Sequence, residues 1–488
     1  MAAPTAAPTA APTEAMPKTT DMTEGKPFGL MARFAVPMML ANVLNLAYTM
    51  ADSAVLGRML GVEAFAAVGA TASLHWLVFS FANGVTQGFG VLFAQRFGAK
   101  DAAGLRQAFA TGSALSLSIG ALIACAGVAG GRTALAALGT PPELMGGASL
   151  YIGWMLGGMP ATFANLLAGA MLRSLGDSKT PLRAMAFSTL LNIALDFALV
   201  VPLGIAGVAA ATLLSQAAAC AFCARALRGV ALGGGSGGGR LGGGRPACAG
   251  GGRPDRRLFG WRDLSAPSAK ALLRLALPLG IRNAVIEAGG LAVQANVNAY
   301  GAVFVAGVAA AKRMYSLMLV AGSALEASVA TFVAQNFGAG RISRVRRGVS
   351  VGLGMMLASS AVFSAATLLF GRAIIGMLVA GEPGRIEAML GFGQRQLGAL
   401  AIGLPMLHLL FLFRSSLEGV GNTQIPMLSG FLELAGRFAA VLFLAPAVGT
   451  WGVYFADVAG WAMAATLLVA SYAAVARRRL RLRPATIR

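Results

Sequence analysis

The feature that most constrains this chain is a duplication: a series of short motifs occurs twice, roughly 240 residues apart and in the same order. The repeated pairs are FAQRFGA at 93–99 with VAQNFGA at 333–339, GDSKTP at 176–181 with GNTQIP at 421–426, GIAGV at 204–208 with GTWGV at 449–453, and Pro37 and Asn42 with Pro278 and Asn283. The offset between the copies drifts by only roughly five residues, which one loop insertion explains. The chain is therefore expected to fold as two similar halves.

Both halves consist mostly of apolar segments long enough to cross a membrane. Hydrophobic residues make up 57% of the 488 residues and charged residues 12%, whereas a soluble domain usually carries about 25% charged residues. The mean hydropathy is +0.71. Twelve hydrophobic segments are expected, near 30–55, 65–94, 107–129, 150–171, 184–202, 206–228, 268–292, 303–334, 348–370, 394–414, 427–445 and 452–475.

The predicted fold is an all-α integral membrane protein with twelve transmembrane helices in two pseudo-two-fold six-helix lobes. Six helices return the chain to its starting side, so the two lobes are expected to have parallel topology. The predicted divisions are a disordered N-terminal tail at 1–27, an N-terminal lobe at 28–228, a Gly/Arg-rich cytoplasmic linker at 229–265, a C-terminal lobe at 266–476 and a basic C-terminal tail at 477–488.

Lys and Arg residues gather in the loops on one side of the expected helices. Roughly 30 lie on the side of the linker and the termini and about 5 on the other side, so the positive-inside rule puts both termini in the cytoplasm. The formal net charge of +21 has the same origin. The basic residues form no stripe with interleaved aromatic residues, so no nucleic-acid partner is expected. The sequence predicts a multi-pass protein of the inner (plasma) membrane, in contact with the lipid bilayer.

No residue pattern points to an enzyme. The sequence has no P-loop, HExxH or GxSxG motif. Cys220 and Cys223 form a CxxC pair in an apolar segment, and His75 and His408 are the only histidines, so packing thiols are a better interpretation than a metal site. Neither catalysis nor a bound cofactor is expected, and uphill transport would have to draw on an ion gradient.

Charged residues inside the expected helices are functional candidates, because a charge in the membrane interior is costly. The acids are Asp52, Asp196, Glu287, Glu326, Glu433 and Asp457. Apart from Arg58, which is expected at the outer surface, Asp52 has no counter-ion nearby in sequence. Asn192 shares a helix face with Asp196 at i,i+4 spacing. Two carboxylates and an amide can ligate a small cation such as Na⁺, or hold a proton because burial disfavours the ionised form. The alternative is that each acid packs against a serine or a backbone donor. Glu326 and Asp457 receive no assignment.

Two further acids of the second half have neighbours of opposite charge. Glu433 and Arg437, at i,i+4 spacing, are expected to form a structural ion pair. Glu287 is either an acid paired with Lys312 or Arg313, or a ligand for a cationic substrate.

Pro37 lies about four turns before Asp52 in the first expected helix. Membrane helices tolerate proline, which frees a backbone carbonyl and often kinks the helix. A bend at Pro37 would move the helix that carries Asp52, although a static kink is an equal alternative.

Five stretches together resemble a known family. They are ADSAVLG at 51–57, QRFGA at 95–99, LRSLGD at 172–177, NIALD at 192–196 and AQNFGA at 334–339. Each is weak alone, but their order, spacing and duplication are specific. Over residues 28–475 the chain resembles the multidrug and toxic compound extrusion (MATE) transporters, closest to the prokaryotic DinF-like branch.

The resemblance implies two six-helix lobes around a central cavity and antiport of organic compounds out of the cell, driven by H⁺ or Na⁺. It implies a cation site at Asp52, Asn192 and Asp196, to which Tyr151 and Thr212 correspond less securely as further members. No metal is expected apart from a transient Na⁺ at the first three residues.

The resemblance also has departures. The NorM branch carries an acid in its tenth helix, whereas residues 394–414 hold none here. Glu287 matches an acid of the NorM branch, and Pro37 corresponds to the proline of the family's first helix. These mixed features leave the identity of the coupling ion open.

The sequence therefore predicts a monomeric, cation-coupled exporter of amphipathic or cationic drugs and metabolites. A flippase or exporter of a lipid-linked or other endogenous metabolite is the alternative on the same fold. A passive channel is a further possibility, which uptake against a gradient would exclude.

Overall fold

The computed structural model describes residues 20–232, 260–378 and 383–478, and the regular secondary structure in these ranges is helical throughout. The first half contains α1 (Pro27–Met59), α2 (Gly61–Gly98), α3 (Ala102–Ala137), α4 (Pro142–Gly157), α5 (Met159–Ser174), α6 (Lys179–Leu203) and α7 (Ile205–Leu232). The second half contains α8 (Ala266–Asn298), α9 (Ala302–Gly338), α10 (Ile342–Leu378), α11 (Pro383–Gly419), α12 (Gln424–Ala439), α13 (Ala445–Val448), α14 (Thr450–Tyr454) and α15 (Ala456–Arg478). A 3₁₀ turn at Trp261–Asp263 precedes α8, and a π-helical turn at Ala440–Leu444 joins α12 to α13.

Ten helices of the described ranges are long and apolar enough to cross a membrane, and α4 and α5 form an eleventh span that is bent by 47°. The bend falls at Gly158, two residues before Pro160, because proline lacks the N–H that would continue the helix. The 33-residue α8 is long enough to be the twelfth span, although it is less apolar than the others. The prediction of an all-α membrane protein is confirmed.

The predicted divisions fall close to helix ends. The first lobe runs into α7, which continues to Leu232, and α8 begins at Ala266. Most of the linker, at 233–259, lies outside the described residues, as do 1–19 of the N-terminal tail and 479–488 of the C-terminal tail.

Residues 20–26, which the sequence assigns to the disordered tail, are docked in the structure. The side chain of Met22 is fully buried. Its backbone N–H donates to Gln335 Oε1 at 2.9 Å, and its carbonyl accepts from Asn336 Nδ2 at 3.1 Å. Arg344 donates to the Gly25 carbonyl at 2.9 Å. This order comes from side chains more than 300 residues away in sequence, so the composition of the segment could not reveal it.

Two helices cross from one lobe to the other. The first part of α1 packs in the core of the second half through Met31 and Phe34, whereas Leu56 near its end packs in the core of the first half. The first part of α8 likewise packs in the first half through Leu272, and Val293 packs in the second half. The core of each lobe therefore includes part of a helix that belongs, in sequence, to the other half.

Equivalent asparagines hold the two crossing helices in place. Asn42 of α1 donates to the Val320 carbonyl of α9 at 3.4 Å. Asn283 of α8 donates to the Ser80 carbonyl of α2 at 3.1 Å. The duplicated Pro–Asn pair thus makes the same contact twice, once in each lobe.

The duplicated glutamines connect the lobes in the same reciprocal way. Gln95 at the end of α2 donates to the Gly419 carbonyl of α11 at 2.9 Å. Gln335 at the end of α9 donates to the Ser174 carbonyl of α5 at 2.8 Å. The two motifs that revealed the duplication therefore lie together on the pseudo-two-fold axis.

Glycine is needed where these two motifs meet. A Cβ atom on Gly98 would collide with the backbone of Gln335, and a Cβ atom on Gly338 would collide with the backbone of Gln95. The small residues let the ends of α2 and α9 touch through their backbones, as is common between membrane helices.

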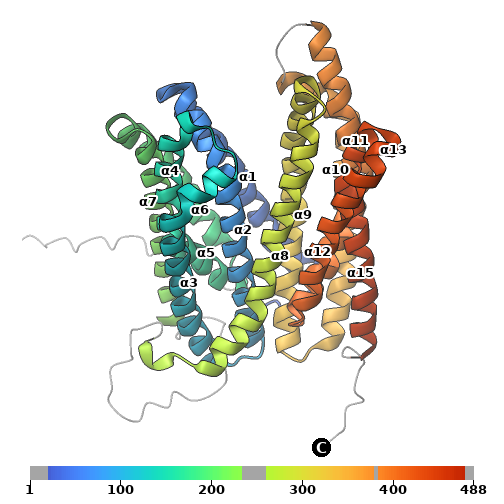
Figure 1. The fold of residues 1–488 in the computed structure, drawn as a ribbon. Coiled ribbons are helices and arrows are strands. Elements are labelled where there is room, and N and C mark those ends of the chain that lie inside the picture. Colours follow the sequence, from blue (N-terminus) through green and yellow to red (C-terminus); the bar gives the residue numbers. More distant parts are fainter. Residues whose placement is uncertain (1–19, 233–259, 379–382, 479–488) are drawn as a thin grey trace, which may run out of the picture.

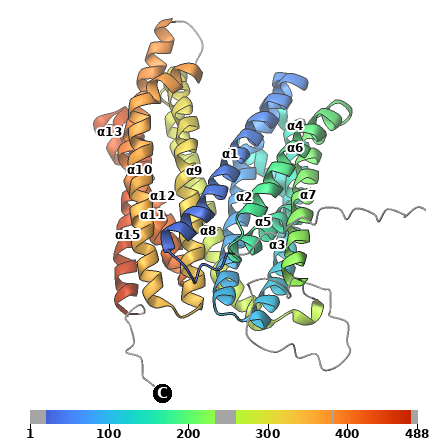
Figure 2. The same ribbon diagram turned by 180° about the vertical axis from the view of Figure 1, so that it is seen from behind.

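The two lobes stand side by side and converge at one end. Their ribbons meet at the lower end of Figure 1 and diverge toward the upper end, and the view from behind shows the same arrangement (Figures 1 and 2). The docked residues 20–26 and the end of α15 both contact the start of α10, since Arg344 bonds Gly25 and Arg346 bonds the Ala476 carbonyl. The described chain therefore begins and ends on the same side, where the lobes meet.

Candidate functional site

A group of polar side chains lies inside the first lobe, and we call it the N-lobe cluster. Its members come from α1, α4, α6 and α7: Tyr48, Asp52, Tyr151, Asn192, Asp196 and Thr212. Tyr48 and Asp52 are one turn apart on α1, as are Asn192 and Asp196 on α6, so each pair faces the same side of its helix. The structure thus gathers all five residues that the resemblance implied.

The two carboxyl groups of the N-lobe cluster are neighbours. Asp52 lies beside Asp196, close enough for a direct interaction. Tyr151 lies within electrostatic reach of both acids. The Tyr48 hydroxyl donates to the Thr212 hydroxyl at 3.2 Å. Oxygen atoms from four helices therefore surround the pair of acids.

The cluster is short of positive charge and of hydrogen-bond partners. Asn192 and Asp196 are fully buried. Both polar atoms of the Asn192 side chain, both carboxyl oxygens of Asp196 and Oδ1 of Asp52 have no hydrogen-bond partner within the described residues. Buried polar atoms are normally paired, so this arrangement is suited to receiving a small cation. Carboxyl, amide and hydroxyl oxygens are the ligands that a hard cation prefers, and the carboxylates are also proton acceptors.

Tyr48 was not identified from the sequence. Its position one turn before Asp52 was the available signal, because i,i+4 residues share a helix face. Tyr48 is neutral, so it does not stand out among the charged residues of the membrane helices.

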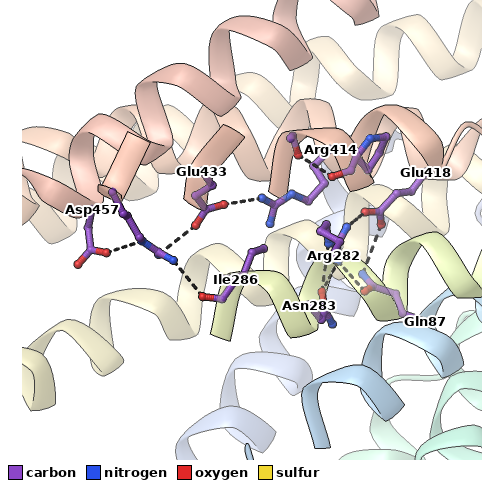
Figure 3. Close-up of polar contacts among 11 residues, drawn as sticks. Gln87, Arg282, Asn283, Ile286, Arg414, Glu418, Glu433 and Asp457 are labelled. Atoms are coloured by element: carbon purple, nitrogen blue, oxygen red, sulfur yellow. Dashed lines mark hydrogen bonds and ion pairs between the residues drawn. The ribbon is translucent and has the colours of Figure 1, made fainter. Parts of the chain in front are cut away.

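The second lobe contains a different polar feature, a buried network of ion pairs that we call the C-lobe network (Figure 3). Its charged members are Arg282, Arg414, Glu418, Glu433, Arg437 and Asp457. Glu433 accepts from Arg414 at 3.0 Å and from Arg437 at 3.1 Å, and Arg437 also binds Asp457 at 2.8 Å. The predicted pair between Glu433 and Arg437 is confirmed, and it belongs to a longer chain of contacts.

The other part of the C-lobe network bridges the two lobes. Arg282 of α8 and Glu418 of α11 form an ion pair whose side chains are 3% and 0% exposed. Arg282 also donates to Gln87 Oε1 of α2 at 3.1 Å. Figure 3 shows Arg282 between Glu418 and Gln87, so a first-lobe side chain completes a second-lobe ion pair.

Glu287 takes a position that the sequence did not anticipate. Its carboxyl group accepts a hydrogen bond from Ser80 of α2 at 3.1 Å. Lys312 instead donates to Gln294 at 2.8 Å, and Arg313 is exposed. Glu287 therefore faces the first lobe, at the boundary between the two halves.

The duplication relates the two polar features position by position. Gly204 and Gly449 mark the register, because both follow a helix and share a backbone conformation that favours glycine, with φ of 57° and 63°. At this spacing Arg437 stands where Asn192 does, and Asp457 stands where Thr212 does. By the spacing of the crossing helices, Val293 stands where Asp52 does.

The helices and the charges within them define a multi-pass membrane protein built from two duplicated lobes. A family model described as MatE matches residues 37–198 and 278–436, one stretch in each half. The chain belongs to the MatE family of membrane transporters, which confirms the resemblance to that family. The assignment to the DinF-like branch stays a prediction.

Individual relatives match over most of their length. The probable multidrug resistance protein YpnP of Bacillus subtilis strain 168 is 26% identical over 406 residues, which cover 83% of this chain and 85% of the relative. The probable multidrug resistance protein NorM of Thermotoga maritima is 24% identical over 423 residues, which cover 82% of each chain. A solved structure described as the outward-facing conformation of a multidrug resistance MATE family transporter has a TM-score of 0.80 at 20% identity and covers 95% of this chain and 100% of the other.

Proposed function

We propose that the protein exports amphipathic, cationic organic compounds from the cell in exchange for H⁺ or Na⁺. The observation that carries this proposal is the N-lobe cluster, in which the fully buried Asp196 and the half-buried Asp52 are neighbours inside a transporter fold. Neither acid forms an ion pair within the described residues. The relatives named as multidrug resistance proteins support drugs as the cargo.

In this proposal the coupling ion binds between Asp52, Asn192 and Asp196. Both H⁺ and Na⁺ neutralise part of the negative charge that these buried groups carry. The hydroxyl oxygens of Tyr151 and Thr212 complete the site for Na⁺, whereas a proton needs only one carboxyl oxygen. The ion is cargo, so it enters from one side and leaves on the other.

The coupling passes through α1. One end of this helix is fixed in the core of the second lobe by Met31 and Phe34, and the other carries Asp52. Pro37 lies between them, within the part that contacts the second lobe, since Met38 and Asn42 beyond it still contact that lobe. Proline removes one helical hydrogen bond and makes this the easiest place to bend. A change of charge at Asp52 can therefore alter how the two lobes are held together.

The proposed cycle is alternating access by a single chain in the plasma membrane. The lobes meet at the end where the basic loops gather, and the positive-inside rule makes that end cytoplasmic. The similarity to a structure described as outward-facing supports the same assignment. Glu287, at the boundary between the lobes, is the proposed contact for a cationic substrate.

The experiment is dye export from proteoliposomes under an imposed pH gradient or an imposed Na⁺ gradient. We expect the Asp52→Asn variant to fall to the level of empty liposomes under the gradient that drives the wild-type protein. The exposed Glu387, paired with Arg372, provides a matched control, because Glu387→Gln also removes one carboxylate and is expected to leave export unchanged. Full export by Asp52→Asn would overturn the assignment of the ion site. Failure of both gradients to drive the wild-type protein would overturn antiport itself.

A further inference from the structure

Three polar atoms without hydrogen-bond partners lie at the interface of α9 and α11. They are Glu326 Oε1 of α9 and His408 Nε2 and Arg414 Nε of α11. All three atoms are buried, and none has a partner among the described residues. A single such atom is an ordinary exception, but three on two packed helices indicate a site.

The three side chains occupy neighbouring layers of this interface. A Cβ atom on Gly322, one turn from Glu326 on α9, would lie 3.3 Å from His408 Nε2. Arg414 and Arg282 both lie within electrostatic reach of Glu326. His408 is fully buried, and its Nδ1 lies 3.0 Å from the Leu404 carbonyl. Since a carbonyl can only accept, Nδ1 carries the proton and Nε2 of the neutral ring is left as an acceptor.

Glu326 differs from the acids around it because it has no ion pair. Glu418, Glu433 and Asp457 each bind an arginine of the C-lobe network, whereas Glu326 forms no ion pair within the described residues. An ionised Glu326 would therefore be a charge without a paired cation, which is costly away from water.

The charges that act on Glu326 come from three of the helices around it. Arg414 and Glu418 belong to α11, Arg282 to α8 and Glu433 to α12. The part of α1 that contacts α9 contains one charged residue, the exposed Arg33. The facing part of α2 contributes the neutral Gln87, which contacts Arg282 and Glu418.

We propose that Glu326, with His408 and Arg414, forms a second proton-binding site, located in the second lobe and separate from the N-lobe cluster. The proton resides on the Glu326 carboxyl group, where it neutralises an acid that has no ion pair and provides a donor on the face of α9 that also carries Gly322, next to His408. Glu326 is only partly buried although Oε1 is covered, so a proton has a path to the other side of the carboxyl group.

Loss of this proton would act on the C-lobe network. An ionised Glu326 competes with Glu433 for Arg414, whose Nε is free to receive it. Glu433 also holds Arg437, which holds Asp457. A proton on α9 therefore changes contacts as far as α12 and α15.

The test uses Glu326→Gln, because glutamine has the shape of a protonated glutamate and cannot ionise. If Glu326 is protonated, the purified variant in lipid bilayers should melt at or above the wild-type temperature at neutral pH. If Glu326 is instead an ionised partner of Arg414, the variant should melt several degrees lower or fail to fold, and either result would overturn the proposal. Glu387→Gln is the matched control for loss of an exposed, paired carboxylate.

Infrared spectroscopy provides an independent measurement. The wild-type protein should show a protonated-carboxyl band at neutral pH that diminishes as the pH rises, and Glu326→Gln should lose one component of it. Asp52→Asn should retain that component, which separates this site from the N-lobe cluster. A spectrum of Glu326→Gln identical to that of the wild-type protein would contradict the assignment. Neither measurement requires transport, so both can succeed if the proposed antiport is wrong.

Discussion

The N-lobe cluster and its counterpart in the second lobe share a scaffold and differ in charge. In the first lobe, Asn192 and Thr212 lie next to two acids that form no ion pair in the part of the chain that the structure describes. In the second lobe, Arg437 and Asp457 occupy the equivalent positions and are joined by an ion pair of 2.8 Å. A cation entering the second position would meet a guanidinium group already in place. Duplication has thus conserved the geometry of the site while one copy carries its own internal cation.

This comparison separates two properties that a buried acid can provide. A carboxylate held by arginines stabilises the packing of its helices once it is buried, because removing either partner leaves an uncompensated charge. A carboxylate without a partner costs stability and is free to bind an ion. The second lobe uses the positions equivalent to Asn192 and Thr212 for an ion pair, whereas in the first lobe these two positions hold neutral side chains beside the acids.

The difference between the lobes is tested most strongly by placing the ion pair of Arg437 and Asp457 at the equivalent positions of the first lobe. We expect the double variant Asn192→Arg, Thr212→Asp to abolish gradient-driven export, because the new guanidinium group would occupy the place of the coupling ion beside Asp196. Dye export from proteoliposomes measures the loss. The fold should survive, as judged by size-exclusion chromatography and by a melting temperature close to that of the wild-type protein. A folded double variant that still exports dye would show that this position does not bind the ion.

A second prediction concerns stability. Glu433→Gln leaves Arg414 and Arg437 buried without the charge they share, and we expect the free energy of unfolding to fall by about 3–5 kcal/mol. Asn192→Leu, at the position equivalent to Arg437, removes a side chain whose polar atoms have no partner, so stability should be unchanged or higher. The stability change of both variants is measured by thermal melting in the same detergent. Equal destabilisation by the two substitutions would contradict the contrast between the lobes.

The smallest expected effect is at Tyr48. Tyr48→Phe removes the hydrogen bond to Thr212 and leaves both acids in place. We therefore expect the binding free energy of the coupling ion to weaken by about 0.5–1.5 kcal/mol. This corresponds to a several-fold weaker apparent affinity for the coupling ion, with the maximal rate retained. The dependence of export on H⁺ or Na⁺ concentration measures it. A complete loss of export would assign Tyr48 a larger role than supporting the site.

The two-lobe helical fold could be predicted from the sequence, because repeated motifs and apolar segments are both visible in the order of the residues. The five residues gathered from α1, α4, α6 and α7 also followed from short motifs and from the resemblance. The C-lobe network was mostly hidden, since among its ion pairs in the described residues only that of Glu433 and Arg437 joins side chains one turn apart. Arg282 and Glu418 are 136 residues apart, and no local spacing signals their contact. The order of residues 20–26 was missed for the same physical reason, because its partners belong to distant helices.

The exchange of half-helices between the lobes has a consequence for biosynthesis. Ser328 of α9 bonds the Met31 carbonyl of α1, although 297 residues separate them. At the usual synthesis rates of about 5–20 residues per second, the first part of α1 waits roughly 15 to 60 s before that partner is made. During this time Met31 and Phe34 have only lipid, or another protein, to cover them. The first part of α1 is therefore covered only after most of the second lobe has been synthesised, so the packing that joins α1 to the second lobe is completed late in translation.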